Sequence, residues 1–162
     1  MGDAIDVILE QWRRERPDLD LSALGVFGRI MRLSAVLTAF MDDWCAAHGL
    51  RAGEFDVLTA LRRAGPAIPS DLADALMMSR SGMTKRLDGL EAAGLVARTL
   101  DPGDRRSFVV ALTDEGRRLI DSALTEHAAN MQRLAEGLSP RERAALEKSL
   151  RTLLTDNRLS PM

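Results

Sequence analysis

One segment, residues 70–107, restricts the fold of this chain more than any other part of the sequence. It predicts a short helix with Ser70 as its N-cap, and a longer helix that begins after the N-cap Ser79 and ends at Gly94. Only two methionines separate the apolar positions of the first helix from Ser79, so the turn between the helices is tight. Two helices joined in this way are typical of a helix-turn-helix.

The longer helix has one apolar face and one polar face. Met83, Leu87 and Leu90 recur at helical spacing and predict the buried face. The opposite face gathers hydroxyl groups and cations near the N-terminus, which suits a helix that enters the major groove of DNA. The same pattern also fits an ordinary amphipathic surface helix. The residues that we expect to contact DNA from these two helices are Ser70, Arg80, Ser81, Thr84 and Lys85.

A β-hairpin is predicted to follow. Residues 95–99 and 108–112 have the pattern of two strands, and the loop between them contains the Asp, Pro and Gly residues of a turn. Arg105 and Arg106 come directly after this loop, where two arginines suit the minor groove or the flanking phosphates. The helices and the hairpin together predict a winged helix-turn-helix.

Length, charge and cysteine content limit the alternatives. A chain of 162 residues can form one domain with a sizeable core. Its net charge is −2, yet residues 79–106 carry more Lys and Arg than Asp and Glu, so positive charge is concentrated where DNA would bind. Cys45 is the single cysteine, which excludes an internal disulfide. We expect no signal peptide and no membrane span, and hence a cytoplasmic protein.

Further helices are predicted on both sides of this lobe. Their apolar stripes exceed what one small lobe can cover, which favours a homodimer with C2 symmetry and half-sites about 10 bp apart on DNA. A monomeric helical domain would show the same stripes. We therefore expect a mainly α protein with a small β-hairpin wing, divided into N-terminal helices for dimerisation and ligand binding (residues 1–48), a winged helix-turn-helix lobe (residues 49–112) and C-terminal dimerisation helices (residues 113–162).

The central sequence carries a resemblance to a known family. Residues 79–116 read SRSGMTKRLDGLEAAGLVARTLDPGDRRSFVVALTDEG. This run resembles the MarR family of bacterial transcription regulators, and its most specific marks are the DPGDRRS loop and the LTDEG that opens the next helix. The resemblance covers nearly the whole chain. It implies a homodimer of winged helix-turn-helix subunits that binds a palindromic operator, and in many members a small ligand weakens that binding.

The N-terminal sequence narrows the resemblance. Trp12 and the run ERPDLDLSALGVFGRI, which begins at Glu15, resemble the urate-responsive, PecS-like subgroup of this family. That subgroup has an extra N-terminal helix with a tryptophan, and a ligand site between the dimerisation helices and the DNA-binding lobe. The resemblance implies that the ligand-binding residues here are Trp12, Asp56, Arg86 and Arg98, with the position of Asp56 depending on loop lengths that vary among relatives.

The chemistry of these residues is compatible with a planar anion such as urate. Arg86 lies ~60° from Met83 on the helix wheel, so it flanks the core and would meet a carboxylate or an anionic ligand. Trp12 can stack on a planar ring, whereas Asp56 would repel an anion. Arg98 can link the wing strand to the recognition helix. We therefore expect urate or a related purine to release the operator, although a core tryptophan and a structural Asp56–Arg86 ion pair would also fit.

Other functions have less support in the sequence. A phenolic or other aromatic acid would suit the same residues. Cys45 would be the reactive thiol of a redox sensor, but neighbouring acidic residues raise the pKa of a thiol. His48 and His127 lack a metal-ligand pattern, and no phosphate-binding loop or nucleophile elbow occurs, so we expect no enzyme, metal or cofactor. A protein-interaction module with an inert winged helix is the last alternative.

Overall fold

The computed structural model describes residues 2–100 and 108–156. The predicted wing tip, with Arg105 and Arg106, lies outside the described residues. The elements follow the order α1 (Ala4–Glu15), α2 (Ser22–Ala47), α3 (Ala52–Ala64), α4 (Pro69–Ala75), α5 (Arg80–Ala92), β1 (Val96–Leu100), β2 (Phe108–Leu112), α6 (Asp114–Leu134) and α7 (Pro140–Thr155). The predicted mainly α fold with one β-hairpin is confirmed.

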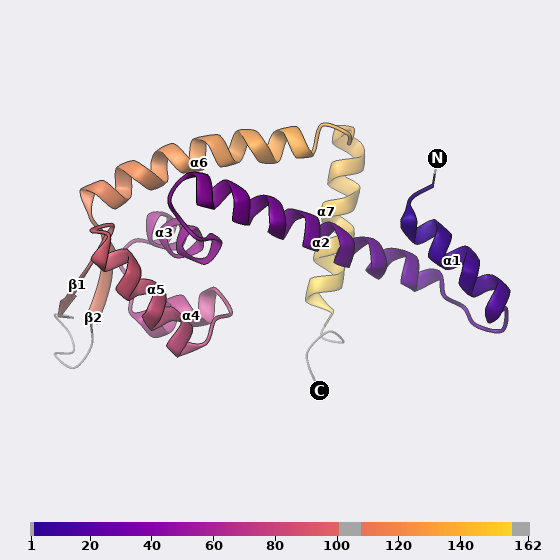
Figure 1. Ribbon diagram of the computed structural model, residues 1–162, viewed down its shortest axis with the longest axis horizontal. Coiled ribbons are helices and arrows are strands. Elements are labelled where there is room, and N and C mark those ends of the chain that lie inside the picture. The colour runs from indigo at the N-terminus through magenta and orange to yellow at the C-terminus, as the bar shows by residue number, and fades with distance from the viewer. Residues whose placement is uncertain (1, 101–107, 157–162) are drawn as a thin grey trace.

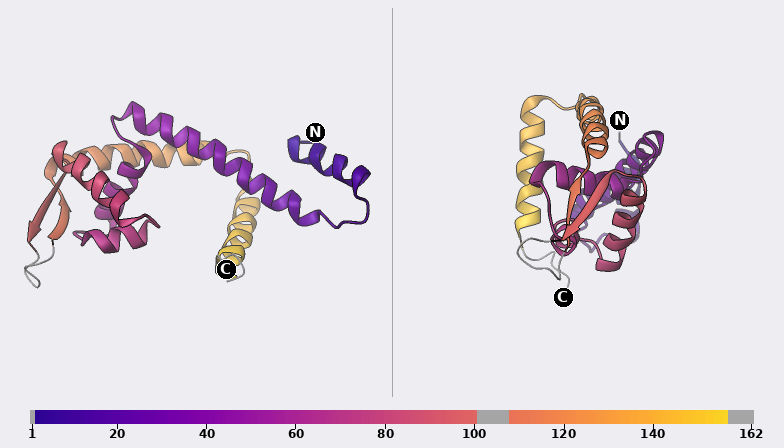
Figure 2. Two further views of the ribbon diagram at one scale, coloured as in Figure 1. Left: turned by 60° about the horizontal axis from the view of Figure 1, so that its bottom comes forward. Right: turned by 90° about the vertical axis from the view of Figure 1, so that its left-hand side faces the viewer.

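The molecule is elongated, with a lobe at one end (Figure 1). The lobe contains α3, α4, α5 and the hairpin, whereas α1 lies at the opposite end (Figures 1 and 2). Helix α6 runs from the lobe to the middle of the molecule, where α7 turns away from it, and α2 runs from the lobe past this point toward α1 (Figure 1). The first helix is thus separated from the lobe by the length of α2.

The core lies inside the lobe and at the ends of α2 and α6 next to it. Met83, Leu87 and Leu90 form the buried face of α5, as predicted. Strands β1 and β2 pair antiparallel from Val96 opposite Leu112 to the end of β1, and Ala67 adds an isolated bridge on the other side of β2. Burial of this apolar face fixes the position of α5 relative to the wing.

Local sequence signals set most of the helix ends. Ser79 accepts a hydrogen bond from the N–H of Gly82, and Thr113 and Ser139 cap α6 and α7 in the same way. The prediction of Ser70 as the N-cap of α4 was wrong, because the helix starts one residue before it, with Ile68 as the N-cap. Proline has the φ of a first helical turn and no N–H to satisfy there, so Pro69 can start the helix.

Helix α1 is fastened to α2 by one arginine. The guanidinium of Arg29 donates to both carboxylate oxygens of Asp3, at 2.8 and 3.1 Å, and to Asp6 at 2.5 Å. Asp3 is also the N-cap of α1, because its side chain accepts from the N–H groups of Ile5 and Asp6. A 12-residue helix is marginal on its own in water, so this contact and the burial of Ile5 stabilise α1 only while it lies on α2.

Candidate functional site

Helix α5 presents a polar face that lies outside the core. Arg80, Ser81, Thr84 and Lys85 are all exposed on it. The hydroxyl of Thr84 donates to the carbonyl of Arg80 at 3.0 Å, which leaves its lone pairs free to accept from a base or from water. The structure therefore places the predicted hydroxyls and cations together in the first turns of the second helix of the helix-turn-helix.

Ser70 lies beside this face, although it belongs to the first helix of the motif. Pro69 and Ser70 line a small hollow of about 240 Å³ together with Arg80 and Thr84 of α5. The turn between the helices includes Met77, which has a positive φ of 51° and a side chain that is 96% exposed. The tight turn thus brings the N-terminal ends of α4 and α5 to one surface.

Arg98 joins the wing to α5, which is the second, or recognition, helix of the helix-turn-helix. From β1, its guanidinium donates to Asp88 at 2.6 Å and to Glu91 at 3.0 Å, both on α5, and its backbone N–H donates to Glu91 at 3.2 Å. The expected link between the wing strand and the recognition helix is present. Glu91 was not predicted to take part, although it follows Asp88 by one helical turn, where residues share a face.

Arg86 reaches from α5 to the first turn of α3. Its Nη1 donates to the thioether sulfur of Met78 at 2.8 Å, and its guanidinium lies directly over Gly53. Asp56 follows Gly53 by three residues, so both are on one face of α3. Burial raises the pKa of the Asp56 carboxyl, while the nearby charges of Arg86 and His127 act to lower it. Asp56 and Arg86 therefore lie close together. No hydrogen bond joins them in the described part of the chain.

Trp12 does not join Asp56 and Arg86 within one chain. It lies on α1, which is at the far end of α2 from the lobe (Figures 1 and 2). Its side chain is 45% exposed. Of the four predicted ligand residues, the structure thus brings two together, directs Arg98 to carboxylates of α5, and leaves Trp12 free to contact something outside its own chain.

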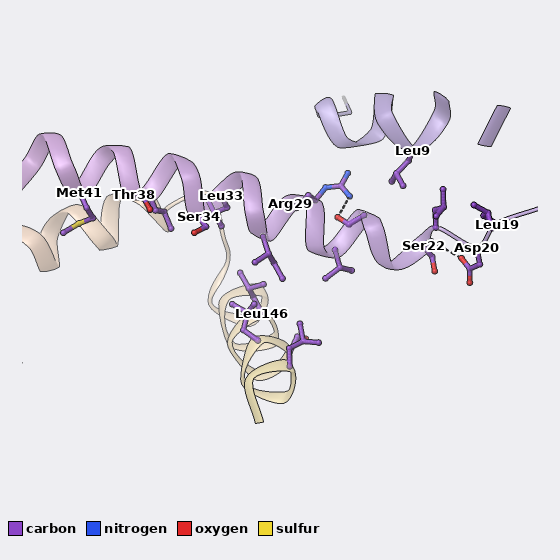
Figure 3. A pocket seen from close by; sticks show the side chains of 18 of the residues that line it. Leu9, Leu19, Asp20, Ser22, Arg29, Leu33, Ser34, Thr38, Met41 and Leu146 are labelled. Carbon is purple, nitrogen blue, oxygen red and sulfur yellow. Dashed lines mark hydrogen bonds between the residues drawn. The ribbon is translucent and has the colours of Figure 1, made fainter. Parts of the chain in front are cut away.

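A long groove runs along α2 and connects these regions. Its volume is about 1280 Å³, and it is lined mainly by apolar side chains of α1, α2 and α7, with Asp56 of α3 among them. Leu9 of α1 and Leu146 of α7 lie on opposite sides of α2, which carries Leu33 and Arg29 (Figure 3). None of the described residues of α7 is buried. The groove is therefore an apolar surface that one chain leaves uncovered.

An aromatic and ionisable cluster lies where α2, α3 and α6 meet. The indole N–H of Trp44 donates to Glu126 at 3.0 Å, and Nε2 of His48 lies 3.1 Å from the same carboxylate. These hydrogen bonds lower the pKa of Glu126. The pKa of His48 is raised, first by its contact with the Trp44 carbonyl and then by Glu126. Cys45 is fully buried beside this cluster, and its burial raises the pKa of the thiol.

The comparison with known proteins identifies the class to which this geometry belongs. A model of the MarR family matches residues 48–107. The HTH-type transcriptional regulator PecS of Dickeya dadantii is 40% identical over 146 residues, which cover 88% of each chain. This chain belongs to the MarR family. The helix-turn-helix, the wing and the flanking helices described above are therefore those of a MarR-family DNA-binding transcriptional regulator.

Solved structures of similar proteins agree with this assignment. Bordetella bronchiseptica BpsR is 30% identical, with a TM-score of 0.70, and the match covers 79% of this chain and 97% of BpsR. A mutant Escherichia coli MarR complexed with operator DNA is 25% identical, with a TM-score of 0.72 and coverage of 88% and 97%. These relatives and their common fold are those of transcription regulators and not of enzymes.

Helix α2 is long and apolar enough, by length and composition alone, to cross a membrane, and 6% of its apolar window is buried within one chain. The expectation of no such segment relied on the absence of an unbroken apolar run. Apolar side chains on the exposed side of α2 line the groove described above. Another surface that covered this side of α2 would therefore lie in the groove.

Proposed function

We propose that this protein is a homodimeric repressor that binds a palindromic operator and is released by urate or a related purine. Two recognition helices related by C2 symmetry would read two half-sites about one helical turn apart. The cations and hydroxyls on the exposed face of α5 support direct contact with DNA, and Ser70 supports it from α4. We also propose a cytoplasmic location, where the operator DNA would be.

A second copy of this chain is the proposed cover of the groove. Leu33 lies in it with 55% of its surface exposed, and three leucines of α7 line it as well. Charged side chains such as Arg29 and Arg32 interrupt α2, which argues for a protein partner over lipid. Leu33→Asp should convert the dimer to a monomer, as measured by sedimentation. The monomer should also bind the operator more weakly. A wild-type protein that is monomeric at micromolar concentration would contradict this proposal.

The position of Arg86 is the observation that supports an anionic effector. Its guanidinium carries five N–H donors. Among the described residues it donates to the thioether sulfur of Met78, which is a weak acceptor. A planar anion with two adjacent acceptors would satisfy these donors in a bidentate manner. Urate is such an anion at neutral pH.

Asp56 gives this site a route to regulation. An anion paired with Arg86 would lie close to the Asp56 carboxylate, and like charges at short range cost free energy. A movement of α5 away from α3 relieves that repulsion and changes the distance between the two recognition helices. A coupling of ~1–3 kcal/mol would weaken DNA binding roughly 5- to 150-fold.

Trp12 enters this proposal through the partner subunit. Because α1 lies far from the lobe of its own chain, its exposed indole would stack on an effector held by Asp56 and Arg86 of the other subunit. Effector binding would then depend on dimerisation. Trp12→Phe keeps an aromatic ring and should reduce the urate response without loss of operator binding.

The test is a titration of urate into the complex of the purified dimer with DNA from upstream of its own gene. Fluorescence anisotropy should show release of wild-type protein by urate and a blunted release of Arg86→Ala, which should need more urate but should still bind the operator. If Arg86→Ala instead fails to bind DNA while it still binds urate, Arg86 belongs to the DNA interface and the proposal is wrong.

An aromatic acid is the second candidate effector. The structure of the relative BpsR concerns regulation of its DNA binding by 6-hydroxynicotinic acid, which is also a planar aromatic acid. Such a ligand would use the same guanidinium of Arg86. Operator binding that resists urate but is lost with this acid or a phenolic acid would favour this candidate over a purine.

A further inference from the structure

Gly53 and Arg86 approach more closely than any other side chain at position 53 would allow. A Cβ atom built on Gly53 would lie 2.2 Å from Nε of Arg86 and 2.6 Å from both Cζ and Nη2. Cβ atoms in proteins essentially never come within 3.0 Å of another heavy atom. Any residue other than glycine at position 53 would therefore push the guanidinium away from α3.

The backbone does not require glycine at this position. Gly49, Gly65 and Gly94 have positive φ values of 70°, 84° and 71°, which explains why glycine occurs there. Gly53 lies within α3 and has ordinary helical geometry. Glycine inside a helix costs up to about 1 kcal/mol relative to alanine, so a propensity argument alone would favour alanine. The space occupied by Arg86 is the feature that requires the missing side chain.

We infer that Gly53 is a positioning residue of the effector site, which keeps open the space through which Arg86 reaches the face of α3 that carries Asp56. This inference rests on the proposed function, because it gives Arg86 the role of binding an anion. Gly53 itself makes no contact with an effector in this account. It acts by setting where the guanidinium of Arg86 lies.

The inference predicts a variant that folds but responds poorly. The atoms nearest to Gly53 belong to the far end of a flexible side chain, so Arg86 can rotate away at little cost to stability. The buried face of α5, formed by Met83, Leu87 and Leu90, is not involved. Gly53→Ala should therefore unfold at the same denaturant concentration as the wild type or a higher one, and should still bind the operator.

The first experiment is a double-mutant cycle on urate release. Gly53→Ala should raise the urate concentration needed for half release at least about tenfold, because the displaced Arg86 guanidinium can no longer donate its hydrogen bond to urate. In an Arg86→Ala background the same change should have no further effect, since Gly53 acts only through Arg86. Gly89→Ala is the matched control: its Cβ would meet Oε1 of Glu54 at an ordinary 3.4 Å. Equal effects of Gly53→Ala with and without Arg86 would overturn the inference.

The second experiment does not depend on the identity of the effector. The Asp56 carboxyl is titrated by NMR in the wild type, Gly53→Ala, Arg86→Ala and Gly89→Ala. The charge of Arg86 lowers the Asp56 pKa, so displacement of Arg86 should raise that pKa in the first two variants but not in the control. A pKa that rises in Arg86→Ala and stays unchanged in Gly53→Ala would overturn the inference. If wild-type protein ignores urate, the proposed effector fails, while this titration still decides the role of Gly53.

Discussion

Gly116 at the start of α6 permits the closest backbone contact that we find for a glycine among the described residues. A Cβ atom on Gly116 would lie 1.9 Å from the carbonyl oxygen of Leu95 and 2.8 Å from its carbonyl carbon. That same oxygen accepts a hydrogen bond from the N–H of Thr113 at 3.1 Å. A normal C···O contact is about 3.3–3.6 Å, so Gly116→Ala requires α6 and the start of the wing to separate by about 1.5 Å.

The magnitude follows from three contributions. Overpacking costs typically 1–3 kcal/mol, and the weakened Thr113–Leu95 hydrogen bond adds about 1 kcal/mol. The better helix propensity of alanine offsets up to about 1 kcal/mol of this cost. We therefore expect Gly116→Ala to lower the free energy of unfolding by about 1–4 kcal/mol, as measured by urea denaturation at one fixed protein concentration, because dimerisation would make stability concentration-dependent.

Gly137→Ala is the control for this measurement. A Cβ on Gly137 has no heavy atom within 4 Å, so its effect should stay within about 0.5 kcal/mol. If Gly116→Ala is as stable as Gly137→Ala, the argument from the Leu95 contact is refuted. The expected loss would explain in physical terms why the LTDEG sequence ends in glycine.

Three further predictions concern the DNA face, pH and oxidation. Lys85→Ala should weaken operator binding similarly on all sequences and reduce the slope of log affinity against log salt by about 1. The raised pKa of His48 should add stability that is fully present below the ordinary histidine pKa of 6.5 and is lost as the pH rises through the raised pKa. The lowered pKa of Glu126 should add stability that is present above the ordinary glutamate pKa of 4.5 and is lost as the pH falls through the lowered pKa. His48→Gln should therefore destabilise the protein more at pH 5.5 than at pH 8.5, about one unit below the ordinary pKa and two above it, in urea titrations; an equal loss at both would refute this sign. Peroxide should leave operator binding unchanged in gel shifts, because the buried Cys45 thiol resists ionisation, and a loss that Cys45→Ser prevents would instead indicate a redox sensor.

Local signals explain what the sequence could predict. Ser79, Thr113 and Ser139 cap helices because a side-chain oxygen acts within three residues of its own position. The apolar spacing of α5 likewise identified its buried face. The error at Ser70 was also local, because the preference of Pro69 for the first helical position decided the helix start.

The candidate effector site was harder to predict, because it depends on contacts between distant segments. Nothing near Gly53 in the sequence indicates that Arg86 will lie over it, since this depends on how α3 and α5 pack. The resemblance to known regulators grouped Trp12 with Asp56 and Arg86, but only the structure separates α1 from the lobe within one chain. A resemblance can thus propose the members of a site, while how far apart they lie within one chain depends on the fold.

The length of α2 has a geometric consequence for any signal that passes along it. Its 26 residues span about 39 Å at 1.5 Å per residue. With the α1 end held by Arg29, a tilt of about 5° would carry the lobe end through about 3.4 Å, which is the rise of one base pair. A rearrangement too small to disturb packing at one end of this lever would therefore shift the recognition helix by a full step along the DNA.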